Sequence, residues 1–309
     1  MPTEAIRVSN WAQLQEELFF NSYRTTIERY RTTYAFRGMT SAMFDLRPSL
    51  MRLGHQQEKL PTIERALLRN FRKYADRDVT RVMTFWEWLS LAQHHGLPTR
   101  ILDWTYSPFV ALHFATDDLS KLNEDAVIWM VDFEQTNQWL ASPLRQKLDE
   151  EVSLVFSVEM LSELFKDVYQ WSRDKAMLAP FVLFFEPPSL DQRIINQFGV
   201  FSLMSRLDVD LRDWLDDRRR ECPDVVRKIV IPARLKWEVR DKLDQMNLTE
   251  RVIMPGLDGL SVWLRRWYVV KDPSAPNSVP TSPPGQKRRR KAPKQASARK
   301  PAKSPSRRR

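Results

Sequence analysis

The sequence predicts an α+β fold in which helices flank one mixed or antiparallel sheet. Strand-like apolar runs alternate with helical patterns along the chain, and no phosphate-loop glycine pattern accompanies them. The chain is 42% hydrophobic and holds eleven Trp, which is enough to build a sizeable core. The apolar runs that read as buried strands are residues 126–132, 181–185, 199–203 and 226–231.

The first hundred residues contain their own start and stop signals. Asn10 is a plausible N-cap for an amphipathic helix over 11–31, and a short strand over 33–37 ends at Gly38. Gly96 and Pro98 end a helix over 85–95, and Ser107 followed by a proline opens another. Residues 39–60 read as a loop, and the remaining helical patterns cover residues 62–77, 135–175, 210–220, 233–246 and 257–267.

Composition divides the chain into three parts. Residues 1–30 form an N-terminal helical segment, and residues 31–271 form one domain whose motifs lie in 31–205. Residues 272–309 hold eight prolines, several Ser and a basic run, with Val279 as the one large apolar residue. Such a segment cannot bury enough apolar surface to offset its ordering entropy, so we expect a disordered tail.

The net charge of +10 belongs to the tail. Twelve of the 49 Lys and Arg lie in residues 287–309, which leaves 37 against 39 Asp and Glu in the rest of the chain. The tail therefore reads as a partner for DNA or RNA phosphates through charge alone. A solubilising extension and a nuclear localisation signal remain open for the same run. Its densest stretch is Lys287, Arg288, Arg289, Arg290 and Lys291.

Cysteine and hydropathy patterns exclude several classes of protein. Cys222 is the one cysteine, so the chain has no internal disulfide and no Cys-rich zinc site. We find no signal-peptide pattern and no apolar window long enough to span a membrane, so we expect a cytoplasmic protein. If the basic tail binds nucleic acid or serves as a nuclear localisation signal, the protein would be nucleoid-associated or nuclear. His94 and His95 point about 100° apart on a helix and do not chelate as a pair, so no metal is expected.

Two short segments concentrate the groups that carry chemistry. The run from Gln93 to Trp104 places two His, an Arg and an Asp around a helix end, either as a buried hydrogen-bond hub or as a ligand site. Arg100 and Asp103 are close enough in sequence to form an ion pair. Arg37 stands at a strand end beside Gly38, where its planar fork suits a phosphate or carboxylate, unless it pairs with Asp103.

The order of these segments resembles the FRG domain family, which is named for the tripeptide at 36–38. The resemblance covers about residues 30–205, and it extends loosely to 265. A later element around Gln197 and Gly199 looks like the family's second glycine segment. The earlier residues that carry the resemblance are Phe36-Arg37-Gly38, Pro48-Ser49-Leu50 with Arg52, Gln93-His94-His95-Gly96-Leu97-Pro98-Thr99-Arg100, Leu102-Asp103-Trp104-Thr105, Ser107-Pro108, Ala111 and Phe114-Ala115.

The resemblance implies limited biochemistry. FRG domains occur mostly in bacterial and phage proteins, and a strand-borne Arg before helices is similar to the ADP-ribosyltransferase fold. By that analogy Arg37 and Gly38 hold NAD, and Thr99, Arg100 and Asp103 line the cofactor pocket. His94, His95 and Gln197 join Arg37 as catalytic candidates.

One departure from such transferases leaves two hypotheses open. They need a carboxylate at the late position, where this chain has Gln197, and Asp103 and Glu186 are the alternatives. The first hypothesis is a ligand-binding, NAD-dependent ADP-ribosyltransferase-like enzyme. The second is a non-enzymatic nucleic-acid-associated or protein-interaction module.

Overall fold

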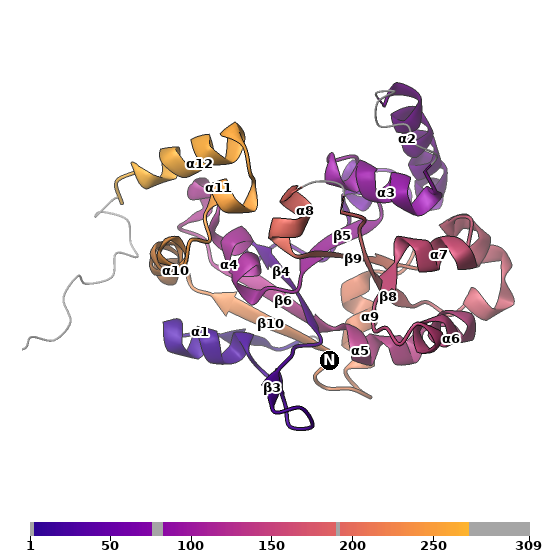
Figure 1. The fold of residues 1–309 in the computed structure, drawn as a ribbon, viewed down its shortest axis with the longest axis horizontal. Helices are drawn as coiled ribbons and strands as arrows, with labels where there is room; N and C mark the ends of the chain where they lie inside the picture. Colours follow the sequence, from indigo (N-terminus) through magenta and orange to yellow (C-terminus); the bar gives the residue numbers. More distant parts are fainter. Residues whose placement is uncertain (1–2, 76–82, 190–191, 272–309) are drawn as a thin grey trace, which may run out of the picture.

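A large mixed sheet runs through the middle of the molecule, with helices on both faces (Figure 1). The computed structural model describes residues 3–75, 83–189 and 192–271, and the predicted tail lies outside them. Most neighbouring strands are antiparallel, whereas β1–β10 and β7–β8 are parallel. The strand order is β1 (Ala5–Arg7), β10 (Val226–Ile231), β6 (Ala126–Asp132), β4 (Tyr34–Met39), β5 (Ile101–Thr105), β9 (Gly199–Met204), β8 (Val182–Glu186) and β7 (Phe156–Ser157).

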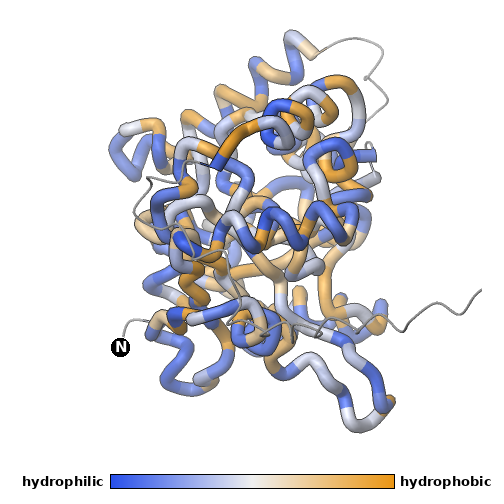
Figure 2. The backbone as a smooth tube through the Cα atoms, turned by 90° about the vertical axis from the view of Figure 1, so that its left-hand side faces the viewer, coloured by the Kyte–Doolittle hydropathy of each residue, from blue (hydrophilic) through white to orange (hydrophobic). Residues whose placement is uncertain are grey.

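Side-chain alternation along the strands builds three large cores. One face of the sheet packs on α5 (Phe133–Thr136) and α9 (Leu211–Arg218). On the other face, the β10–β6–β4 half packs on one set of helices and the β5–β9–β8 half on another. The first set is α1 (Trp11–Leu18), α4 (Pro108–Thr116) and α10 (Ala233–Gln245), and the second is α3 (Phe85–His94), α6 (Ser142–Glu150) and α7 (Val158–Leu164). Along the helices the hydropathy colours alternate, as amphipathic elements require (Figure 2).

The sheet is split between its two central strands. β4 pairs with β6 from Tyr34 to Met39, and β5 pairs with β9 over its whole length. Between β4 and β5 the register contains one pair, Phe36 opposite Thr105. The two halves of the sheet therefore diverge beyond that pair, at the level of Arg37 and Asp103.

Helix α4 lies directly on strand β4, and Gly38 permits this contact. A Cβ atom at Gly38 would stand 1.8 Å from the carbonyl oxygen of Ala111 and 2.8 Å from the amide nitrogen of Ala115. Both atoms belong to the α4 backbone and cannot move aside alone. The absence of a side chain at Gly38 thus sets the distance between helix and sheet.

Most of the predicted elements are confirmed. The strands at 126–132 and 226–231 and the helix opened by Ser107 have the expected bounds, and Ser107 caps its helix through Val110. Helix α3 ends where expected, since Gly96 has a φ of +78°. Three further helices are α2 (Leu60–Tyr74), α8 (Gln192–Gln197) and α12 (Leu257–Trp267); α8 was not foreseen.

One long helix prediction is wrong, and a second helical segment is interrupted. The helix capped by Asn10 ends at Leu18, because the next segment is rich in Tyr, Thr and Ile and forms the hairpin β2 (Tyr23–Arg24) and β3 (Arg29–Tyr30). Residues 135–175 are largely helical, as expected, but in separate pieces: the chain breaks at Val152, whose φ of +50° is left-handed, and then enters β7. Strands β1, β5 and β7 were not foreseen, because two are very short and β5 carries the exposed Asp103.

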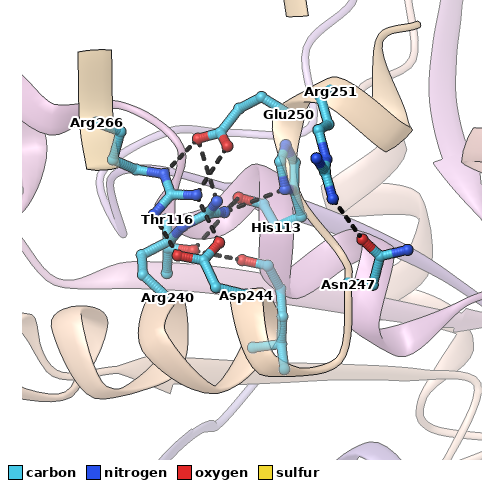
Figure 3. Close-up of polar contacts among 9 residues, drawn as sticks. His113, Thr116, Arg240, Asp244, Asn247, Glu250, Arg251 and Arg266 are labelled. Carbon is cyan, nitrogen blue, oxygen red and sulfur yellow. Dashed lines mark hydrogen bonds and ion pairs between the residues drawn. The ribbon is translucent and has the colours of Figure 1, made fainter. Parts of the chain in front are cut away.

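A buried polar network attaches the C-terminal helices (Figure 3). Glu250, in α11 (Glu250–Ile253), accepts hydrogen bonds from Arg240 of α10 and from Arg266 of α12. Arg266 also forms two bonds to Asp244, and Arg240 contacts the ring of His113 in α4. The charges in this network are balanced, so burial is tolerated.

We predict that Gly38→Ala lowers the free energy of unfolding by about 3 kcal/mol, because the new methyl group overlaps the α4 backbone. Urea unfolding of both proteins measures the difference. Gly199→Ala is the control, since its Cβ would meet nothing closer than 3.8 Å and should cost less than about 1 kcal/mol. Equal losses in the two variants would contradict the role of Gly38.

We predict an acid-sensitive contribution from His113. Burial and the neighbouring Arg240 lower the pKa of this histidine from 6.5 to about 3. Between these values the unfolded chain binds a proton that the folded chain does not, so stability falls as pH drops below 6.5. Urea unfolding at several pH values measures how the free energy of unfolding changes with pH. Below pH 6.5 this change should be smaller in His113→Gln than in wild type, by up to about 1.4 kcal/mol per pH unit. Parallel slopes would show that the histidine does not contribute.

Candidate functional site

A cavity of about 1210 Å³ opens at the split between β4 and β5. Its floor comes from residues 36–39 of β4, from 103–105 of β5 and from Phe201 of β9. Its walls come from the end of α3, from Phe114 of α4, from α8, and from the segment 40–52. Residues of both strand faces line it, as expected where neighbouring strands separate. Of the predicted site residues it brings together Arg37, Gly38, His94, His95, Asp103 and Gln197.

Arg37 is partly buried and incompletely paired. Its Nη1 donates to the main-chain oxygen of Asp103 at 2.5 Å and lies 3.8 Å from the carboxylate of the same residue. Its Nε is buried without a hydrogen-bond partner among the described residues. Burial lowers the pKa of Arg37, Asp103 opposes this, and Arg52 lowers it further. The side chain keeps donors available for an anion.

Arginine outnumbers aspartate on the cavity walls. Arg37, Arg47, Arg52 and Arg193 line it, against Asp45 and Asp103. Arg47 is already paired with Asp210 at 3.0 Å, whereas Arg52 donates a hydrogen bond to the main-chain oxygen of Arg47. An excess of positive charge in a concave site favours an anionic ligand.

Asp103 is the carboxylate of the cavity floor. Its Oδ2 accepts a hydrogen bond from Gln93 Nε2 at 2.8 Å, and its side chain is 54% exposed. Gln93 Oε1 in turn accepts from the hydroxyl of Thr99, which is buried. The polar run at the end of α3 is thus a hydrogen-bonded hub, as one interpretation of the sequence expected, and part of it also faces the cavity.

Arg100 does not reach the cavity. It is 5% exposed, and its guanidinium makes three hydrogen bonds to the carboxylate of Glu64 in α2. The expected pair between Arg100 and Asp103 is therefore wrong. Side chains alternate along an extended chain, so two residues that are three positions apart point to opposite sides. Thr99 also lies behind the cavity wall, where it bonds Gln93 and Ser49.

Gln197 lines the cavity, and two of its polar groups have partners within the chain. Its amide donates to the carbonyl oxygen of Ile253 at 3.4 Å, and its own main-chain oxygen accepts from Thr105. The alternative carboxylate Glu186 accepts from Tyr106 and is absent from the cavity lining. Asp103 is therefore the better placed of the two carboxylates.

The two histidines line the cavity. His94 and His95 contact each other edge to face, with ring centroids 5.2 Å apart. Over the described residues there is no group of three or more potential metal ligands. The same part of the chain contains no helix that is long and apolar enough to cross a membrane.

Sequence reasoning did not single out Glu64, Gln93 as an orienting residue, or Phe44 in the wall, whereas Arg193 belonged to the later segment of the family resemblance. Glu64 and Phe44 stand in ordinary helical and loop patterns, so nothing local distinguished them. Arg52 was part of the family resemblance and had a signal, although we assigned it no role.

The comparisons with known proteins agree with the family resemblance. No curated protein and no solved structure matches the chain. The model of one family, described as the FRG domain, matches residues 32–124. That match includes Arg37, Arg52 and Asp103 on the cavity and ends before α8. The chain therefore carries an FRG domain, and its residues 32–124 supply the floor and much of the wall of the cavity.

Proposed function

We propose that the cavity binds a phosphate-bearing ligand, NAD, and that the protein is an ADP-ribosyltransferase-like enzyme. The observation that carries this proposal is the state of Arg37. It is a partly buried guanidinium whose hydrogen bond goes to a main-chain oxygen, with Arg52 close enough to lower its pKa. Two neighbouring cations destabilise each other unless an anion joins them.

A diphosphate suits this end of the cavity. The guanidinium is planar and can donate two parallel bonds to phosphate oxygens, and one such charge-assisted bond contributes about 1.5–3 kcal/mol. The cavity volume is large enough for a dinucleotide. Gly38 contributes a bare backbone beside Arg37, although its nearest steric constraint is the contact with α4.

NAD would supply an ADP-ribosyl group attached to nicotinamide, a cationic ring that leaves readily. The chain would supply binding and orientation. Arg37 and Arg52 hold the phosphates, and Asp103 places a negative charge near the ribose. His94 and His95 line the cavity, where an acceptor substrate would approach. Gln197 supports the wall through α11 and has no role in proton transfer.

The competing proposal is a binding module without turnover. The same cavity would take the same class of ligand, and Gln197 in place of a carboxylate favours this outcome. Incubation of the purified protein with labelled NAD and a cell extract separates the two. Transfer of label indicates an enzyme, and binding without transfer or hydrolysis indicates a module.

We predict that Arg37→Ala weakens NAD binding by about 10- to 100-fold, the value of one or two charge-assisted hydrogen bonds. Isothermal titration calorimetry measures the affinity, and the labelled-NAD assay should lose transfer in parallel. Arg206→Ala is the matched control, because Arg206 is an exposed arginine, paired with Asp208, that does not line the cavity. If Arg37→Ala binds NAD as tightly as wild type, the proposed site is wrong.

We also propose that the basic run 287–309 binds DNA or RNA phosphates. The supporting observation is its composition of twelve Lys and Arg without an acidic residue. Binding by charge alone falls steeply with salt and has no sequence preference.

Deletion of residues 272–309 should reduce affinity for a random DNA duplex by at least about 10-fold at low salt, and should flatten the salt dependence. Fluorescence anisotropy at several salt concentrations measures both. The folded part carries a slight excess of acidic residues and should not compensate. Unchanged binding after the deletion would place the nucleic-acid contact elsewhere or exclude it.

A further inference from the structure

We infer that Asp103, oriented by Gln93, recognises the ribose hydroxyls of a ribose-phosphate ligand. The inference rests on the proposed anion-binding function of the same cavity and adds a second recognition element to it. The starting observation is a half-exposed carboxylate inside a cavity whose charged residues are otherwise mostly arginine.

The hydrogen bonds around Gln93 leave its amide one orientation. The main-chain amide of Ile101 donates to the Thr99 hydroxyl oxygen, and the hydroxyl donates onward to Gln93 Oε1. The amide nitrogen must then face the carboxylate of Asp103, which accepts and has no proton to give when ionised. A buried residue, Thr99, thus fixes the direction of the Asp103 carboxylate.

The bond from Gln93 uses only part of the hydrogen-bond accepting capacity of the Asp103 carboxylate. Oδ2 receives the Gln93 bond, and Arg37 stands 3.8 Å away without a hydrogen bond to the carboxylate. No described residue bonds Oδ1. An ionised carboxylate can accept about four hydrogen bonds, so acceptor sites remain open toward the cavity.

The charges nearby restrict what can fill those sites. A cationic ligand group at Asp103 would lie beside Arg37 and Arg52 and be repelled by them. An anionic group at Asp103 would be repelled by the carboxylate itself. A neutral hydroxyl donor meets neither penalty. A vicinal diol next to a phosphate therefore fits, with the diol on Asp103 and the phosphate on the arginines.

Asp103 is then the residue that determines specificity, and Gln93 is a positioning residue that acts through it. Asp103→Ala is an informative variant, because Arg37 donates to the main-chain oxygen of Asp103 and keeps that bond when the side chain is removed. Gln93→Met preserves length and removes the amide. Gln146→Met is the matched control, since Gln146 on α6 also donates to a carboxylate, that of Glu150, on an exposed surface.

The test is calorimetric titration of the full chain with ADP, 2′,3′-dideoxy-ADP and pyrophosphate. Wild type and Gln146→Met should bind ADP about 10-fold tighter than the dideoxy analogue, the value of one hydrogen bond to a charged group. In Asp103→Ala this ratio should fall to about 2 or less, while pyrophosphate binds at least as tightly as before because a negative charge is gone. Gln93→Met should lower the ratio and leave pyrophosphate binding within about 2-fold.

The outcomes separate the two proposals. Equal binding of ADP and its dideoxy analogue by wild type, or an unchanged ratio in Asp103→Ala, overturns the role of Asp103 and leaves the anion site standing. A wild-type protein that binds none of the three compounds and no NAD overturns the proposed function, and the ribose inference with it.

Discussion

The contact between helix α4 and strand β4 at Gly38 is the constraint on which the site depends. With no side chain at this position, the carbonyl oxygen of Ala111 reaches the strand backbone at a distance that no other residue type would permit. The helix then lies flat against one half of the sheet and places Phe114 at the cavity wall. A wider spacing would move α4 outward and separate the wall from Arg37.

The split beside this contact opens the cavity in the sheet. Continuous pairing between β4 and β5 would satisfy the main-chain oxygen of Asp103 through a strand amide. Because the pairing stops after Phe36 and Thr105, that oxygen instead accepts from the Arg37 side chain. The irregularity therefore fixes a guanidinium and a carboxylate side by side at the cavity floor, and each has unused hydrogen-bonding capacity.

Local patterns in the sequence predicted much of the fold and of the site. The strands at β6 and β10 are continuous apolar runs, and α3 and α4 carry strong caps, so tertiary context had little to alter. The segment after Leu18 was misassigned, and the break within 135–175 was missed, because helical periodicity over part of a segment does not show where each helix ends. Arg37, Asp103 and Gln197 were found together, whereas the partner of Arg100 was missed, since Glu64 lies 36 residues away in an unremarkable helix.

The two arginines of the family segments differ in how far the chain itself satisfies their charge. Arg100 is buried and makes three hydrogen bonds to the carboxylate of Glu64, so its charge is balanced within the chain. Arg37 is partly buried, yet its hydrogen bond goes to a neutral carbonyl oxygen, and its nearest carboxylate is shared with Gln93. Burying an incompletely paired charge costs free energy that packing alone does not recover. The chain completes one such pair and leaves the other incomplete on a cavity, and the ligand proposed above would supply the missing partner of Arg37.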